Sequence, residues 1–197
     1  MARIYIFKRF ERFWHWSQAA LIMFMLFSGF EVHGTYSFFG YDNAVSFHTV
    51  AAWMIISLWV FAVFWTFTTG EWKQYIPTME KVDAMMKYYL TGIFTHAPHP
   101  FKQTTLSKHN PLQRLAYLFV LVVINPVIWF SGWLYLFYND LSVVGLGGIP
   151  LEWIAFFHVI GAFMVLIFLI VHVYLATAGH TPTAHIKAMI TGWEETD

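Results

Sequence analysis

One apolar stretch near the carboxyl end decides the fold: residues 153–178 read WIAFFHVIGAFMVLIFLIVHVYLATA. The stretch contains no Asp, Glu, Lys or Arg, but it carries two histidines, His158 and His172, fourteen residues apart. Fourteen residues rise about 21 Å along a helix and return to within roughly 40° of the same face. Ionisable side chains are costly in hydrocarbon and therefore indicate function when they lie inside a membrane span. This spacing predicts two metal centres stacked across one membrane.

Four apolar runs are long enough to cross about 30 Å of hydrocarbon as helices. The chain is 58% hydrophobic and only 11% charged, which excludes an ordinary soluble domain. We therefore predict an all-α integral membrane protein, a four-helix bundle in the lipid bilayer that forms a single domain over residues 1–197. The predicted spans cover about residues 13–30, 50–68, 115–138 and 153–178.

The positive charges predict the direction of the spans. All 11 Lys and Arg residues lie in the amino-terminal tail, between spans two and three, or after span four. The other two connections, residues 31–46 and 139–152, contain neither Lys nor Arg. The positive-inside rule therefore places the amino and carboxyl termini in the cytoplasm. Between spans two and three, the mixed polar and apolar segment 78–90 fits a short interfacial helix.

Depth along the predicted spans sorts four histidines into two pairs. His15 and His172 lie toward the cytoplasmic side of their spans, whereas His48 and His158 lie toward the far side. Each pair offers two imidazole ligands to one metal, and imidazole suits iron. The chain has no cysteine, which excludes iron–sulfur clusters, thiolate sites and covalent haem attachment. Two non-covalent haems with two axial histidines each fit these limits, and such haems transfer electrons because no coordination position stays open.

Glycines on the same helices are further candidates for haem binding, because small residues allow close backbone approach. Gly29 lies fourteen residues after His15, at the depth of the far-side pair. Gly161 lies one turn after His158, and Gly132 in span three is a third candidate. Plain helix packing explains each glycine equally well.

Several motifs extend this pattern. They are Trp14-His15-Trp16, His48, Lys108-His109-Asn110-Pro111-Leu112-Gln113-Arg114, His158 and His172. With these residues the chain resembles, over nearly its whole length, the four-helix, two-haem cytochrome b subunits of bacterial respiratory formate dehydrogenases, nickel–iron hydrogenases and thiosulfate reductases. The resemblance implies that the four histidines bind two b haems, each by bis-histidine ligation.

The resemblance also implies a quinone site beside the cytoplasmic-side haem. Asn110 would bind menaquinone or ubiquinone there, with the backbone of Leu112 as a second contact. Asn is also a common residue at the start of a helix, and the two roles can hold together. His109 is a candidate proton donor, because the pKa of an unperturbed histidine lies near neutrality.

The resemblance implies an electron-transfer subunit of a respiratory oxidoreductase complex in the bacterial cytoplasmic (inner) membrane, rather than a complete enzyme. Its partner would be a periplasmic-side redox subunit, either an iron–sulfur protein or a multihaem cytochrome c, and electrons would pass between that subunit and the quinone pool. The alternative is a free-standing haem b quinone reductase that oxidises a soluble reductant such as superoxide. A solute transporter would show inverted repeats and broken helices, which the sequence lacks. No basic stripe indicates nucleic acid.

Overall fold

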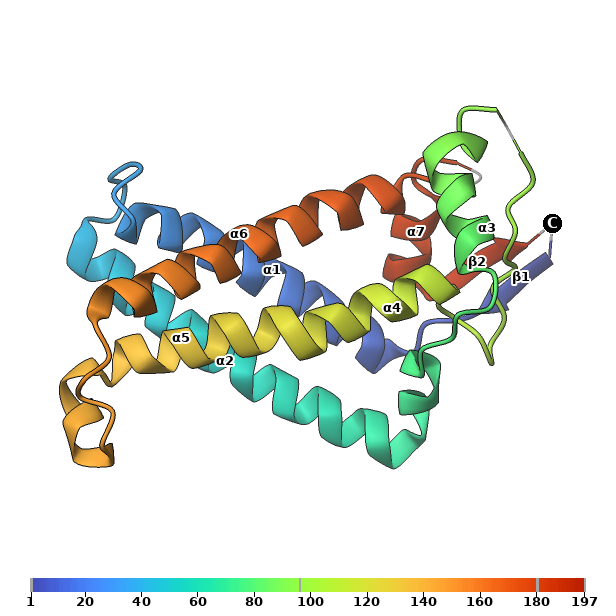
Figure 1. The fold of residues 1–197 in the computed structure, drawn as a ribbon. Helices are drawn as coiled ribbons and strands as arrows, with labels where there is room; N and C mark the ends of the chain where they lie inside the picture. Colours follow the sequence, from blue (N-terminus) through green and yellow to red (C-terminus); the bar gives the residue numbers. More distant parts are fainter. Residues whose placement is uncertain (1, 96, 180, 197) are drawn as a thin grey trace. The chain divides into compact units, whose positions relative to one another are not determined.

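A computed structural model describes residues 2–95, 97–179 and 181–196, and it consists mostly of helices (Figure 1). The predicted all-α fold is confirmed. Each predicted span coincides with a long helical segment. These segments are α1 (Arg9–Val32), α2 (Tyr41–Thr69), the run from α4 (Pro111–Phe119) through a π-helical turn to α5 (Asn125–Leu136), and α6 (Leu151–Ala176).

Three of these segments are long and apolar enough to cross a membrane, as judged over the described residues: Tyr41–Thr69, Pro111–Leu136 and Leu151–Ala176. Only 11% of the most apolar window in each is buried inside the protein. So much exposed apolar surface requires a lipid environment. Helix α1 has 24 residues and is therefore about 36 Å long, but its first half carries His15, Ser17 and Gln18. That α1 crosses the membrane as a fourth span stays a prediction.

The chain forms two compact units. The first comprises Met1–Gln74, Thr104–Lys108 and Gly179–Asp197, and it contains α1, α2, α7 (Ala184–Thr191) and two short strands. The second comprises Tyr75–Gln103 and His109–Ala178, and it contains α3 (Val82–Lys87), α4, α5 and α6.

In the first unit, the two ends of the chain form a small sheet that the sequence did not predict. Strand β1 (Ala2–Tyr5) pairs antiparallel with β2 (Trp193–Thr196). Next to the sheet, the Trp16 indole donates a 3.1 Å hydrogen bond to the carbonyl of Met189, near the end of α7. The amino- and carboxyl-terminal segments therefore lie together, as their predicted placement on one side of the membrane requires. That this side is the cytoplasm stays a prediction.

The turn between α1 and α2 depends on one buried carboxylate. Glu31 Oε1 accepts hydrogen bonds from the backbone N–H groups of Phe38, Phe39 and Gly40, at 2.7–2.8 Å. Helix α2 begins directly after this turn, at Tyr41, well before the predicted start of its apolar span near residue 50. The early start has a physical reason, since Asp42 lies in the first turn, where a negative charge favours the helix.

In the second unit, the segment before α4 contains the short helix predicted there. Helix α3 continues into a π-helical turn at Tyr88–Gly92, so this helical piece overlaps the predicted segment 78–90. A second π-helical turn, Val120–Ile124, separates α4 from α5. Pro126, the second residue of α5, supplies the cause, because proline removes a backbone donor and clashes with the preceding helical turn.

Candidate functional site

His48 in α2 is held by two neighbouring residues of α1. Its Nδ1 lies 3.0 Å from the hydroxyl oxygen of Ser28, which is fully buried. The same hydroxyl donates to the carbonyl of Phe24, at 2.9 Å. A Cβ atom added to Gly29 would lie 3.2 Å from His48 Cε1, so only glycine lets the ring lie this close to α1. The ring of His48 is therefore fixed on one side and at one nitrogen.

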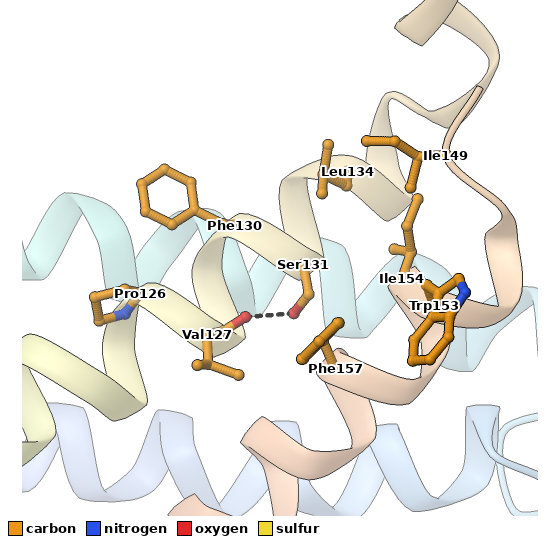
Figure 2. A pocket seen from close by; sticks show the side chains of 9 residues that line it. All are labelled: Pro126, Val127, Phe130, Ser131, Leu134, Ile149, Trp153, Ile154 and Phe157. Carbon is orange, nitrogen blue, oxygen red and sulfur yellow. Dashed lines mark hydrogen bonds between the residues drawn. The ribbon is translucent and has the colours of Figure 1, made fainter. Parts of the chain in front are cut away.

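His158 in α6 has the same environment, built by two neighbouring residues of α5. Its Nδ1 lies 3.0 Å from the hydroxyl oxygen of Ser131, and that hydroxyl donates to the carbonyl of Val127 at 2.6 Å. A Cβ atom on Gly132 would lie 3.3 Å from His158 Cε1. Figure 2 shows Ser131 with its hydroxyl directed at Val127, at the edge of an apolar cavity of about 450 Å³ between α5 and α6.

His15 and His172 lie among aromatic side chains. The ring centroid of His15 lies 5.2 Å from that of Trp16, and the planes are perpendicular. The ring of His172 stacks on Phe168 at 5.8 Å, one turn earlier in α6. All four predicted ligands are half-buried. Each predicted pair, His15 with His172 and His48 with His158, takes one histidine from each unit, so the pairing stays a prediction from the sequence.

The predicted glycines differ in what they contact. Gly29 lies against His48, and Gly132 lies against His158, so both make room for an imidazole ring. Gly161 instead faces Ile128 of α5, where an added Cβ would meet its Cα, Cβ and Cδ1 atoms at 3.1–3.2 Å. The structure therefore gives Gly161 a helix-packing role within the second unit, and a contact of Gly161 with a haem stays untested.

Asn110, the predicted quinone ligand, is 3% exposed and forms the N-cap of α4. Its Oδ1 accepts from the backbone N–H of Gln113 at 2.9 Å, and Gln113 Oε1 accepts from the backbone N–H of Asn110, also at 2.9 Å. Its amide nitrogen donates to the hydroxyl oxygen of Tyr89 at 3.0 Å. Burial raises the pKa of Tyr89 above its ordinary value, although the bond from Asn110 opposes the shift. The Tyr89 hydroxyl thus keeps its proton.

His109 packs between two tyrosine rings of the second unit. The centroid of Tyr75 lies 5.2 Å from that of His109, and the centroid of Tyr117 lies 5.1 Å away in an edge contact. The guanidinium Nε of Arg114 donates to the carbonyl of His109 at 3.0 Å. His109, Asn110 and Tyr89 therefore form a polar and aromatic group at the start of α4.

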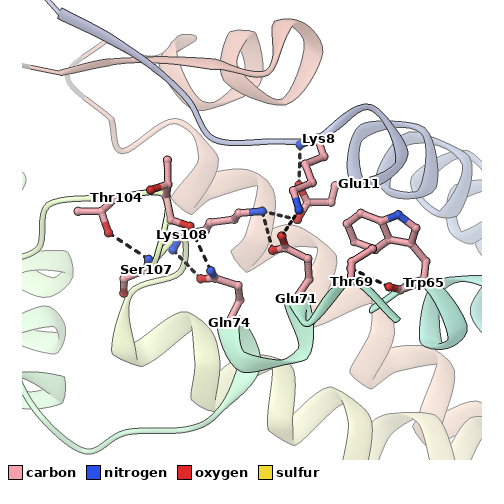
Figure 3. Close-up of polar contacts among 10 residues, drawn as sticks. Lys8, Glu11, Trp65, Thr69, Glu71, Gln74, Thr104, Ser107 and Lys108 are labelled. Atoms are coloured by element: carbon pink, nitrogen blue, oxygen red, sulfur yellow. Dashed lines mark hydrogen bonds and ion pairs between the residues drawn. The ribbon is translucent and has the colours of Figure 1, made fainter. Parts of the chain in front are cut away.

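A buried ion-pair network in the first unit was missed in the sequence. Lys108 is 3% exposed, and its Nζ lies 2.7 Å from Glu11 Oε1 and 2.8 Å from Glu71 Oε2 (Figure 3). Glu71 also pairs with Lys8, at 2.5 Å. Gln74 accepts a hydrogen bond from the backbone N–H of Lys108, at 2.9 Å. Lys108, the first residue of the Lys108–Arg114 motif, thus joins the start of α1 to the short segment that directly follows α2.

The donor groups fit a haem. A bis-histidine haem needs two oriented imidazoles in apolar surroundings, with the ligating nitrogen deprotonated. His48 and His158 meet the first requirement, because a serine and a glycine fix each ring. A hydrogen bond at Nδ1 assigns the proton to that nitrogen and leaves Nε2 as the ligating atom. Helices long and apolar enough to cross a membrane, together with imidazoles oriented in this way, are typical of a membrane cytochrome b.

The chain belongs to the prokaryotic cytochrome b561 family, whose model matches residues 6–192. It is therefore a membrane protein that binds haem b and transfers electrons. It is also similar to a protein of Escherichia coli (strain K12) named "Putative cytochrome YdhU", with 31% identity over 198 residues that cover 97% of this chain and 74% of the relative. No solved structure matches the chain.

Proposed function

We propose that the chain is a two-haem b subunit that anchors a respiratory oxidoreductase complex in the bacterial inner membrane. Electrons would pass through it between a periplasmic-side redox subunit and the quinone pool, with both termini in the cytoplasm. One observation carries the proposal: His48 and His158 have the same two neighbours. In each case a serine hydroxyl lies at hydrogen-bond distance from Nδ1, and a glycine lies against the ring.

A bound haem supplies one-electron exchange between ferrous and ferric iron. The residues of the chain hold and orient it. His48 and His158 would ligate through Nε2, because their Nδ1 atoms lie on serine hydroxyls. By their depth in the predicted spans, these two histidines would share the far-side haem, and His15 and His172 would share the cytoplasmic-side haem.

The quinone, menaquinone or ubiquinone, would bind beside the group formed by His109, Asn110 and Tyr89. The Oδ1 atom of Asn110 already caps α4, so its amide group is the part that could donate to a quinone carbonyl. The Tyr89 hydroxyl accepts from that amide and has its own proton to donate. His109 directly precedes Asn110 in the sequence, and its imidazole would exchange protons with the bound quinone.

The partner would be an iron–sulfur protein or a multihaem cytochrome c. The alternative, a free-standing quinone reductase that oxidises superoxide, would need an anion to reach the far side. Residues 31–46 and 139–152 contain Glu31, Asp42, Asp140 and Glu152 but no Lys or Arg. An anionic reductant is steered by positive charge, so this composition favours a protein partner.

Haem counting and ligand variants test the central part of the proposal. Acid–acetone extraction and a pyridine haemochrome assay should find two extractable b haems per chain. His48→Ala and His158→Ala should each remove the same haem, and His15→Ala and His172→Ala should each remove the other one. A single haem, or loss of different haems within a pair, would contradict the proposed ligation.

A test of the quinone site needs a variant of Asn110 that still caps α4. Asn110→Ser preserves a good capping side chain but removes the amide donor. We expect Asn110→Ser and Tyr89→Phe to slow quinol-dependent haem reduction while both haems stay bound. Normal reduction in both variants would place the quinone elsewhere.

Purification from native membranes separates the two functions. A redox subunit that co-purifies in a fixed ratio supports the proposed complex. A chain that purifies alone, and whose haems are reduced by superoxide, supports the free-standing quinone reductase.

A further inference from the structure

The environments of His48 and His158 contain the same residue types in the same arrangement. In each unit a Ser-Gly pair on one helix faces a histidine on the next: Ser28-Gly29 faces His48, and Ser131-Gly132 faces His158. The distance from Oγ to Nδ1 is 3.0 Å in both, and a Cβ atom added to the glycine would lie 3.2 Å from Cε1 in one and 3.3 Å from it in the other. Plain helix packing does not require both units to place the same two atoms of a histidine in this way.

The hydrogen-bond directions follow from the number of protons. A serine hydroxyl has one proton and two acceptor lone pairs. Ser28 Oγ lies 2.9 Å from the carbonyl of Phe24, and Ser131 Oγ lies 2.6 Å from the carbonyl of Val127. A carbonyl can only accept, so the hydroxyl proton goes to it. With the hydroxyl proton assigned to the carbonyl, each hydroxyl accepts from the histidine, which places the imidazole proton on Nδ1. His48 also has a hydrogen bond to the backbone of Met25, so Ser28 is one of two acceptors there.

We propose that Ser28 and Ser131 are positioning residues that set the electron-donor strength of the two haem ligands His48 and His158. The proposal rests on the proposed haem ligation. An imidazole that donates its Nδ1 proton to an acceptor becomes a more basic ligand at Nε2. A more basic ligand stabilises ferric iron, so the two serines lower the reduction potential of the haem that these histidines bind.

The chain offers one matched control, Ser57. Ser57 of α2 donates to the carbonyl of Trp53 at 2.9 Å, in the same back-bonded geometry as Ser28. Its side chain is exposed, and no histidine ring nitrogen is among its described hydrogen-bond partners. Ser57→Ala therefore reports the cost of losing such a back-bond in the same helix that carries His48.

The test compares Ser28→Ala, Ser131→Ala and the double variant with Ser57→Ala in the purified full chain with its haems. Redox titration followed by absorbance gives each haem's potential, and low-temperature electron paramagnetic resonance gives the g values of the ferric haems. We expect the two single variants to raise the potential of one and the same haem and to shift its g values, and the double variant to raise that potential further. Haem retention in dilute detergent should fall by about tenfold. Ser57→Ala should leave all three readouts unchanged.

Ser28→Cys extends the test if an alanine variant fails to assemble, because sulfur is a weak acceptor of similar size. An intermediate rise in potential supports the proposal. Unchanged or lowered potentials and unchanged g values in the serine variants would overturn it, even where His48→Ala and His158→Ala lose the haem. If those histidine variants keep both haems, the proposed ligation itself is wrong. Shifts of two different haems by Ser28→Ala and Ser131→Ala would keep the positioning role but contradict the pairing of His48 with His158.

Discussion

The two ends of the α1–α2 hairpin are held together by different kinds of interaction. At the ion-pair end, defined by Lys8, Glu11, Glu71 and Lys108, two lysines and two carboxylates join the start of α1 to the residues that directly follow α2. At the His48 end, the end of α1 contacts the start of α2 through the Ser28 hydroxyl, Gly29 and the Glu31 carboxylate.

The difference indicates that the ion-pair end mainly stabilises the fold, whereas the His48 end mainly orients a proposed haem ligand. Each buried charge needs an oppositely charged partner, because an unpaired charge in a low-dielectric interior greatly lowers the free energy of unfolding. The ion-pair end therefore tolerates little change. The His48 end uses a hydroxyl and backbone N–H groups, and none of its described contacts involves a Lys or Arg side chain. Changes to the residues that contact His48 itself, Ser28 and Gly29, should therefore affect the cofactor more than the fold.

The largest expected effect lies at the ion-pair end. Lys108→Met keeps the length of the side chain but leaves Glu11 and Glu71 buried without their shared cation. We expect a loss of roughly 3–5 kcal/mol in the free energy of unfolding. Thermal or denaturant unfolding of the detergent-solubilised protein, followed by circular dichroism, measures the loss.

Lys8→Met is the matched control for Lys108→Met. The Lys8 side chain is 49% exposed, and it also contacts Glu71. A half-exposed ion pair contributes at most about 1 kcal/mol. Equal losses in the two variants would mean that burial of the network adds nothing, and the contrast between the two ends would not hold.

A smaller effect is expected from Glu31, which fixes the turn at the His48 end. Glu31→Ala removes the acceptor of three backbone N–H groups, and we expect a loss of about 2 kcal/mol. Glu31→Gln keeps an acceptor oxygen and should recover most of this stability. Hydrogen exchange at the amides of Phe38, Phe39 and Gly40 should accelerate in the alanine variant alone. Unchanged exchange would show that the carboxylate does not hold the turn.

The glycine next to His48 should affect the haem rather than stability. In Gly29→Ala, the new Cβ would lie 3.2 Å from His48 Cε1, so the ring must move by a few tenths of an ångström. Alanine gains about 1 kcal/mol of helix propensity, which offsets the crowding. We expect altered g values and absorbance of one haem at nearly constant stability, and the same result for Gly132→Ala.

Gly161→Ala provides the contrast, because its new Cβ would meet Cα and Cβ of Ile128 at 3.1–3.2 Å. Backbone atoms cannot move aside cheaply, so we expect a loss of about 1 kcal/mol and an unchanged haem spectrum. A changed spectrum in Gly161→Ala would support the sequence prediction that this glycine lies beside a haem.

The sequence predicted the long helices because lipid imposes about 20 apolar residues on each span. It also singled out His48 and His158, since a histidine in such a run is costly. It did not predict their serine partners. Ser28 and Ser131 lie 20 and 27 residues from the histidines they contact, and only the repeated Ser-Gly dipeptide hints at a shared role.

The ion-pair network was even harder to predict from the sequence. Lys108 is separated by 97 residues from Glu11 and by 37 from Glu71, and no local periodicity links such distant charges. Asn110 was predicted both as a helix cap and as a quinone ligand. The structure bears out the cap because capping is a local interaction with Gln113, whereas quinone binding depends on a molecule outside the chain.

The smallest expected effect is the pH dependence of the ion-pair end. Burial tends to raise the pKa of Glu71, but hydrogen bonds and charge from Lys108 and Lys8 outweigh it and hold the pKa below the ordinary value of 4.5. A carboxylate with a lowered pKa in the folded state stabilises the protein fully above pH 4.5, and this contribution disappears as the pH falls through the folded-state pKa. The unfolding temperature should therefore drop between about pH 5 and about pH 3, and Glu71→Gln should flatten that drop. Glu195→Gln, which removes an exposed pair with Arg3, should leave the drop unchanged. If Glu71→Gln kept the full acid sensitivity, other carboxylates would cause it, and the ion-pair end would differ from the His48 end in geometry alone.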